Sequence, residues 1–309
     1  MDGQGAVARV FAEKITWLQD TNWWQMLGYA WLVFIFGRLA MLAMPAILKP
    51  FLDKPLFVLP LLLIVAKDLA GIPDFRQRMR RVARKGTPWS ERIGAAFPPE
   101  FLALYRLDRA MRQAFLAWLR RQPQAPRPAG TVLTYTERGS YATVLAIAIF
   151  CACIELPLDA AIASLFIDNP RVRAIVHVCS LLSAASILMY VTADRRLVRG
   201  AKGHVLTADT LDLSIGARAS GLVPLDAIES IDTVKEKPEQ WRRRHGVAKR
   251  ETLTVSPFDE PNVVLRLRWD RPVTITTWQL EKPAPTWVFL YLDRPELLSA
   301  ALRRGAPLV

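Results

Sequence analysis

The chain has 309 residues, of which 52% are hydrophobic, and a formal net charge of +13. Residues 72–142 carry 14 Lys and Arg against five Asp and Glu, whereas residues 196–309 carry 18 against 14. The basic excess therefore flanks the apolar runs, as the positive-inside bias of membrane proteins requires. Because the location of the charge decides between a membrane and a nucleic-acid partner, we expect no nucleic acid to bind.

Residue types that carry enzyme chemistry form no recognisable motif. The sequence contains no GxxxxGK[ST] phosphate loop, no GxSxG nucleophile turn and no HExxH zinc helix. Cys151, Cys153 and Cys179 lie in apolar runs without a CxxC pair, and we expect them to be buried small hydrophobes. We therefore expect no catalytic residue, no cofactor and no metal site, and we favour a non-enzymatic role.

The first 71 residues predict a surface helix and a membrane hairpin. Residues 6–18 have one apolar helical face, which suits a helix at the membrane surface or an ordinary packed helix. The first span, 25–48, follows a tryptophan pair, and its 24 residues reach ~36 Å, enough to cross a ~30 Å hydrocarbon core. The second span, 55–71, contains Pro60, and we expect Lys67 to snorkel at its cytosolic end.

Residues 72–141 are expected to form a basic cytosolic loop. Within it, 99–121 has an apolar stripe opposite several arginines and predicts an amphipathic helix, either at the membrane surface or against a partner helix. A segment of six basic residues precedes this helix. Each can add ~1 kcal/mol of attraction to anionic lipid, although we favour the alternative that the segment stops transfer and sets the topology. These candidate lipid contacts are Arg76, Arg78, Arg80, Arg81, Arg84 and Lys85.

A second membrane hairpin is predicted over residues 142–193. Its spans are 142–167 and 172–193, and only four residues, DNPR, separate them. Basic residues follow the second and fourth spans, so both termini should be cytosolic. The expected location is a bacterial inner membrane, which the chain crosses four times.

The remainder, 196–309, alternates apolar and polar residues in eight short runs and predicts a cytosolic all-β barrel or sandwich of many antiparallel strands. RPELLSAALRR (294–304) predicts a closing helix that buries Leu297, Leu298, Ala301 and Leu302. The expected strands lie in 204–209, 210–215, 219–225, 229–234, 251–256, 262–269, 273–278 and 287–292.

The segment LDLSIGARASGLVPLDAIESIDTV (211–234) resembles the opening hairpin of bacterial PH-like domains. The whole arrangement is similar to that of bacterial membrane proteins with a C-terminal PH-like domain. The resemblance implies a fold and a docking or oligomerising role, but no reaction. The basic insert 235–250 departs from the pattern of a compact hairpin. The matching residues are Leu211, Leu213, Gly216, Val223, Pro224, Leu225, Ile228 and Ile231.

Four ionisable residues lie inside the predicted spans: Arg38, Glu155, Asp159 and His177. A charge at mid-bilayer costs ~2.5–3.5 kcal/mol on insertion scales, so such groups should face inward and pair. Equal depth pairs Arg38 with Glu155, and Asp159 with His177. The network either locks the helix bundle or moves protons or ions.

Two functions follow from these expectations. The first is a non-enzymatic membrane scaffold whose PH-like domain docks a protein partner or forms a homo-oligomer. The alternative is a transport-class protein that uses the four intramembrane groups. Copurification of a stoichiometric partner would favour the scaffold, whereas ion flux through a homo-oligomer would favour transport.

Overall fold

The computed structural model describes residues 17–304 apart from 20, 46, 48, 84–87, 125, 127 and 202. Most of the expected helix 6–18, together with Arg84 and Lys85, lies outside the described residues. The chain forms two compact units, Met1–Leu102 and Ala103–Val309, which meet within α5 (Pro99–Leu119). Each unit is described by itself.

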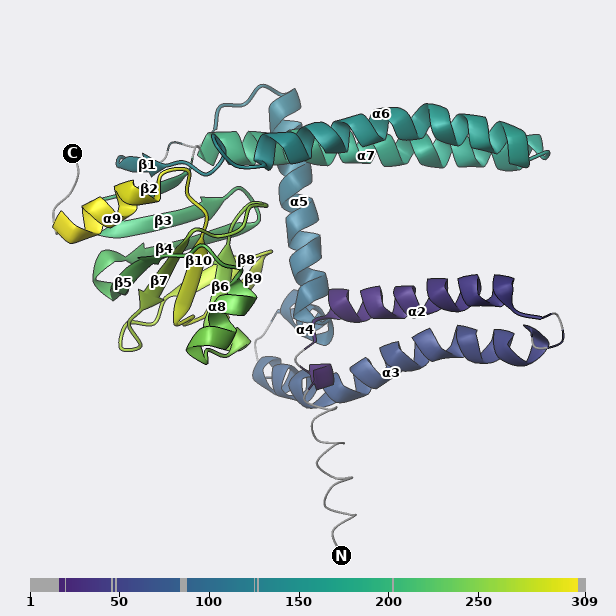
Figure 1. Ribbon diagram of the computed structural model, residues 1–309, viewed down its shortest axis with the longest axis horizontal. Helices are drawn as coiled ribbons and strands as arrows, with labels where there is room; N and C mark the ends of the chain where they lie inside the picture. Colours follow the sequence, from purple (N-terminus) through teal and green to yellow (C-terminus); the bar gives the residue numbers. More distant parts are fainter. Residues whose placement is uncertain are drawn as a thin grey trace, which may run out of the picture. The chain divides into compact units, whose positions relative to one another are not determined.

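In the first unit, α2 (Trp23–Ala43) and α3 (Lys49–Val82) pack as a hairpin, followed by α4 (Trp89–Ala96) (Figure 1). Asn22 begins α2, and its side chain accepts a hydrogen bond from the backbone of Gln25 at 2.8 Å. The expected loop after residue 71 is wrong at its start, because α3 continues to Val82. Arg76, Arg78, Arg80 and Arg81 therefore lie on the last turns of a helix.

Lys67 differs from its expected position. Its side chain is buried at 6% exposure, and its ammonium donates to the carbonyls of Leu18, Gln19 and Thr21 at 2.6, 3.2 and 2.6 Å. These carbonyls come from the segment that precedes α2. Because three backbone acceptors satisfy its three donors, the lysine ties this segment to α3 instead of snorkelling.

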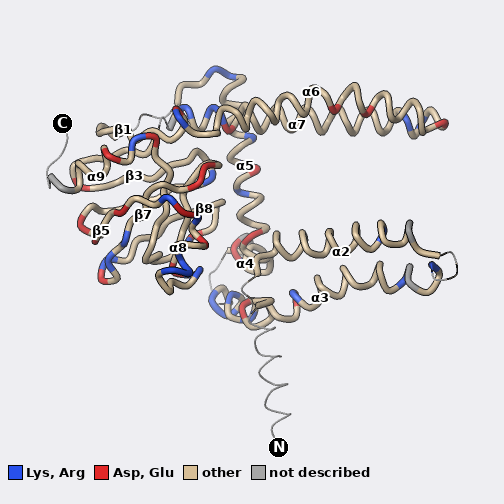
Figure 2. Tube along the Cα trace, in the orientation of Figure 1, with Lys and Arg blue, Asp and Glu red and all other residues tan. Residues whose placement is uncertain are grey.

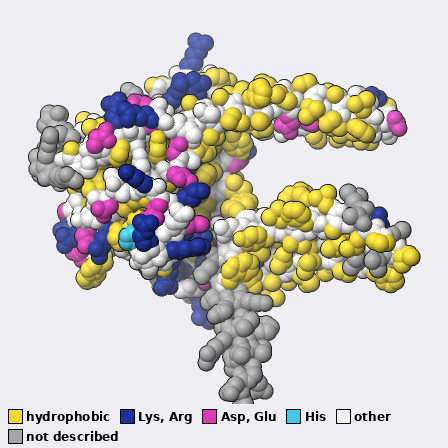
Figure 3. All heavy atoms as spheres, in the orientation of Figure 1, with side chains coloured by type: hydrophobic (Ala, Val, Ile, Leu, Met, Phe, Trp, Pro, Cys, Tyr) yellow, Lys and Arg dark blue, Asp and Glu magenta, His cyan; other side chains and the backbone are white. Residues whose placement is uncertain are grey.

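Three helices among the described residues are long and apolar enough to cross a membrane: α3, α6 (Tyr141–Phe166) and α7, which runs from Pro170 to Ala201. The 21-residue α2 is not among them. Helices α6 and α7 pack side by side and carry apolar side chains outward, such as Leu165 at 75% exposure (Figure 3). The three cysteines are also exposed on this hairpin, so their expected burial is wrong.

Charged residues are sparse along α6 and α7 and gather near the two ends of the hairpin and over the β-rich region (Figure 2). We call the end that carries Tyr141 and Asp194 the base of the hairpin. An apolar outer surface of this kind makes favourable contact with lipid chains and unfavourable contact with water.

The β-rich region forms two sheets. Each of the eight runs expected to be strands overlaps one, whereas β1, β9 and the helix α8 (Pro238–His245) were not predicted. The first sheet has the order β1 (Thr131–Leu133), β2 (His204–Leu206), β3 (Thr210–Ile215), β4 (Ala219–Pro224), β8 (Thr274–Thr277) and β9 (Leu280–Pro283). The second has the order β5 (Ile228–Thr233), β7 (Val263–Leu267), β10 (Trp287–Leu290) and β6 (Thr252–Val255).

The pairing of β10 with β6 is parallel, whereas the sequence led us to expect antiparallel strands. The basic insert explains the difference, because α8 and a 3₁₀ turn at 249–251 carry the chain from β5 to β6 at the opposite edge of the second sheet. A parallel partner needs such a crossover. Trp241 of α8 anchors the crossover by packing on Trp287 and Phe289.

The core of this region lies between the sheets and is closed by α9 (Pro295–Arg304). Leu298 is fully buried and Ala301 is 8% exposed, while Leu297 and Leu302 pack partly buried against the same core, which confirms the predicted closing helix. Burial of a leucine contributes ~1.5–3 kcal/mol. The hairpin of β3 and β4 also matches its prediction, and Gly216 takes the positive φ of +52° that its turn requires.

Candidate functional site

The chain on either side of the α6–α7 hairpin forms strands of the same β-sheet. Strand β1 precedes α6 and β2 follows α7, and the two pair antiparallel with Thr131 opposite Leu206. This pairing holds the base of the hairpin against the turn between β3 and β4. At Gly216 of that turn, an added Cβ would lie 3.1 Å from the Cβ of Leu197 in α7. The base of the α6–α7 hairpin is therefore built into the β-rich region.

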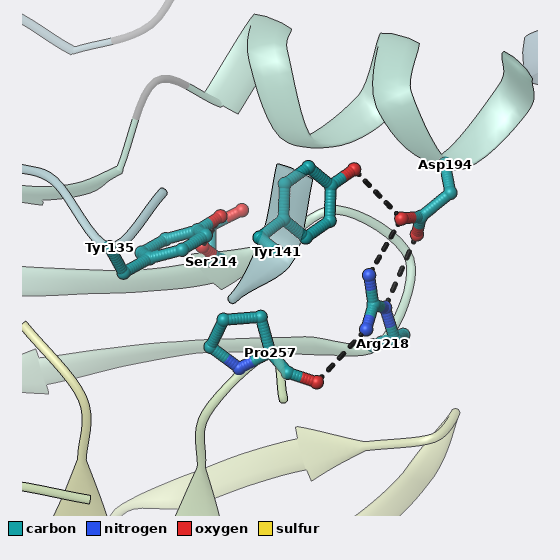
Figure 4. A network of polar contacts seen from close by, with 6 residues as sticks. All are labelled: Tyr135, Tyr141, Asp194, Ser214, Arg218 and Pro257. Carbon is teal, nitrogen blue, oxygen red and sulfur yellow. Dashed lines mark hydrogen bonds and ion pairs between the residues drawn. The ribbon is translucent and has the colours of Figure 1, made fainter. Parts of the chain in front are cut away.

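A buried polar network fills this junction (Figure 4). Asp194 of α7 and Arg218 of the β3–β4 turn form a bidentate ion pair, with Nε–Oδ1 at 3.2 Å and Nη2–Oδ2 at 2.6 Å. The hydroxyl of Tyr141, the first residue of α6, donates to Oδ2 of Asp194 at 2.9 Å. The remaining guanidinium nitrogen, Nη1, donates to the carbonyl of Pro257 at 3.1 Å. One carboxylate thus joins both α6 and α7 to the β-rich region.

The network is well shielded from solvent. The side chains of Arg218 and Asp194 are 6% and 10% exposed. The guanidinium carbon lies 4.5 Å from the ring centroid of Phe258, which stacks on Tyr141 at 6.0 Å and 19°. Burying both charges is expensive, and only close bidentate geometry with further hydrogen bonds offsets that desolvation. All of these conditions hold here.

The segment 134–140, which we call the collar, leads into α6. It is hydrogen-bonded to the segment that follows β10 of the second sheet. Asp293 accepts backbone N–H bonds from Glu137 and Arg138, both at 2.9 Å, and its own N–H donates to the carbonyl of Thr134 at 2.8 Å. Arg138 returns a side-chain bond to the Asp293 carbonyl at 3.3 Å. Asp293 therefore fixes the first part of the backbone that leads into α6.

A second aspartate completes the collar. Asp259 accepts the backbone N–H of Ser140 at 2.8 Å through Oδ1. Its other oxygen would lie 2.4 Å from a Cβ placed at Gly139, so a larger residue there would displace the Asp259 carboxylate. Burial, and then the carboxylates of Asp259 and Asp293, raise the pKa of Tyr291. Its phenol therefore stays protonated between the two acids well above neutral pH.

Helix α5 packs on the same end of α7. Met111 and Ala114 are buried against Ala193 of α7. Tyr190 of α7 donates to the carboxylate of Asp108, which also pairs with Arg112. The predicted helix is thus confirmed, and part of its apolar face is covered by α7.

The structure brings only part of the predicted intramembrane network together. Asp159 on α6 accepts a hydrogen bond from Ser180 of α7 at 2.5 Å. Ser180 lies one helical turn beyond His177, so the serine takes the place that the depth argument assigned to the histidine. Glu155 is half-buried on α6. Arg38 lies in the first unit, 6.0 Å from the ring of Phe34, and its pairing with Glu155 stays a prediction.

The basic segment at the end of α3 keeps its candidate role. Arg76, Arg80 and Arg81 lie on the last turns of the helix, and Arg78 donates weakly to the carbonyl of Ala95 at 3.4 Å. Whether these residues touch anionic lipid stays a prediction.

The junction residues escaped sequence reasoning because no local pattern marks them. Tyr141 and Asp194 are 53 positions apart and Arg218 lies 24 positions beyond Asp194. The one available signal is a lone acid, Asp194, at the start of the basic run in the last turns of α7. Chemically, the network can hold three elements together, because the Asp194 carboxylate binds both Arg218 and the hydroxyl of Tyr141. Among the residues that the structure describes, no three His, Cys, Asp or Glu side chains converge in a metal-binding arrangement.

Comparison with models of protein families, with curated proteins and with solved structures finds no match to this chain.

Proposed function

We propose that this protein is a membrane-anchored scaffold that holds a β-rich docking domain in one orientation at the membrane surface. The buried pair of Asp194 and Arg218 carries the proposal. A domain that is merely tethered needs a flexible linker, whereas here both flanks of a membrane hairpin enter the sheet and a desolvated ion pair locks the joint. Fixed orientation is useful to a protein that presents a surface to a partner.

The proposal includes a topology of four spans in a bacterial inner membrane, with both termini in the cytosol. The fourth span is α2, whose 21 residues reach ~32 Å at ~1.5 Å per residue and pack along α3. Reporter fusions at residues 126 and 304 should both give a cytosolic signal, while one at 169 should give a periplasmic signal. A periplasmic signal at 304 would refute this topology.

The docking part is assigned to a PH-like domain. The two sheets, the closing helix α9 and the resemblance of 211–234 support the assignment. The exposed indole of Trp269, 92% accessible on the loop after β7, is a candidate anchor for the partner because tryptophans dominate binding energy at interfaces. The partner is a protein of the same membrane or a second copy of this chain.

Molar mass in mild detergent tests the proposal. The full chain should elute as a complex larger than the monomer, either a homo-oligomer or a stoichiometric assembly, and Trp269→Ala should shift it toward the monomer. Trp278→Ala, at 56% exposure, is the matched control. A monomer without a partner, in both natural and variant forms, would contradict the scaffold.

A second candidate is proton or ion transport. The observation that favours it is the pair of acids on α6, of which Asp159 is hydrogen-bonded to Ser180 and Glu155 lies one turn away. Flux into liposomes should then fall in Asp159→Asn and Glu155→Gln while the chain stays folded. Flux through the natural chain that does not exceed the leak of empty liposomes, or flux that is unchanged in both variants, would exclude this role.

A further inference from the structure

A groove runs along the base of the α6–α7 hairpin. Its volume is about 270 Å³, and it begins at Tyr141 beside the junction network. One wall is the stripe of Leu145 and Ile149 on α6, and the other is Val191 on α7. Ala142 and Ala146 of α6 also line the groove, and their small side chains leave it unfilled.

The groove ends in two arginines. Arg195 and Arg199 follow Val191 at intervals of four residues, so all three share one face of α7. Both guanidinium groups are exposed, and within the part of the chain that the structure describes neither has a hydrogen-bond or ion-pair partner. Thr136 of the collar lines the same rim. The groove therefore changes from apolar walls to unpaired positive charge over two helical turns.

Such a gradient matches one molecule of an anionic phospholipid. The arginines lie just beyond Asp194, where the apolar run of α7 ends and a bilayer's phosphates would lie. Guanidinium groups bind phosphate oxygens through paired N–H donors, and the apolar walls suit an acyl chain. A free phosphate would gain nothing from those walls.

We propose that this groove is a binding site for a single anionic phospholipid, with its phosphate on Arg195 and Arg199 and an acyl chain between Leu145, Ile149 and Val191. The proposal rests on α6 and α7 spanning the bilayer, which is part of the proposed function. Because Tyr141 is both a wall of the groove and a donor to Asp194, a bound lipid would also buttress the junction.

The test is titration of the full chain in detergent with dioleoyl phosphatidylglycerol, followed by native mass spectrometry. Two arginine–lipid contacts of ~1 kcal/mol each, converted at ~1.4 kcal/mol per tenfold, predict that the Arg195→Gln/Arg199→Gln variant binds about 30-fold more weakly. The control, Arg171→Gln/Arg173→Gln, removes two charges at the other end of α7 and should change affinity by less than about threefold. Equal losses in both variants would show attraction by charge alone and overturn the site.

Two further arms fix the ligand. Ala146→Leu fills the groove and should weaken phosphatidylglycerol binding with both arginines present, whereas Ala161→Leu, near the other end of α6, should not. Inorganic phosphate at the same concentration should neither bind nor displace the lipid. Displacement by phosphate, or full affinity in Ala146→Leu, would contradict the lipid assignment. Retention of the chain in carbonate-washed membranes checks the membrane anchor separately, so the two proposals fail by different results.

Discussion

Removal of one charge from the junction should destabilise the protein far more than removal of both. Arg218→Leu leaves the buried carboxylate of Asp194 with only the Tyr141 hydroxyl, and Asp194→Leu leaves a guanidinium that is 6% exposed without its ion-pair partner. Breaking a buried pair costs about 3–5 kcal/mol, whereas replacing both partners by apolar residues is often nearly neutral. At ~2–4 °C per kcal/mol for a unit of this size, each single change should lower the Tm by roughly 6–20 °C.

A double-mutant cycle measures this difference. The two single variants and the double variant are melted in the same detergent, with circular dichroism as the readout. Arg268→Leu serves as the control, since this arginine is exposed and pairs only with Asp270. The double variant should recover most of the lost Tm. Additive losses would mean that the two charges do not share one desolvated contact, and the reasoning about the junction would fail.

The collar and the closing helix give two more predictions. Asp293→Ala removes the acceptor of two backbone N–H groups and should speed trypsin cleavage after Arg138 at least about tenfold, since each lost bond is worth ~1.5–3 kcal/mol. Asp270→Ala should leave that cleavage rate unchanged, and equal rates in both variants would refute the collar's role. Leu298→Asp should aggregate the chain on expression, whereas the matched Leu222→Asp, at a position 62% exposed, should yield folded protein. Soluble, natively melting Leu298→Asp protein would show that the helix does not close the core.

Sequence reasoning reached the elements that depend on local patterns. The apolar runs predicted α6 and α7 within a few residues at most boundaries, and period-2 alternation located β3 at Thr210–Ile215. Burial of Leu298 followed from the same kind of pattern. These signals are local because side-chain direction repeats with the backbone period.

Sequence reasoning missed features that depend on residues distant in the chain. Strand β1 has only three residues and was assigned to a loop. It is a strand because it pairs with β2, from which α6 and α7 separate it in the sequence. Gly130 shows how close that pairing is, since an added Cβ would lie 2.4 Å from the carbonyl oxygen of Leu206. The pairing of Asp159 with Ser180 was missed for a related reason: depth alone does not distinguish neighbouring turns of one helix face.

The extension of α3 has a different cause. A run of arginines was interpreted as loop because charge ends a membrane span, but it does not end a helix. Arginine is a good helix former, so the backbone continues to Val82 after the apolar part has ended. Hydropathy therefore marks the residue at which the apolar part ends, but not the residue at which the helix ends.

Distance distributions between the membrane hairpin and the β-rich domain test the scaffold most directly. Cys151, Cys153 and Cys179 are replaced by serine, and spin labels are attached to cysteines introduced at residues 171 and 269. Double electron–electron resonance in lipid nanodiscs then measures the distance between the labels and so reports the orientation of the domain. The account predicts one narrow distribution for the natural junction and a broad one for Arg218→Leu. A broad or multimodal distribution with the junction intact would contradict it.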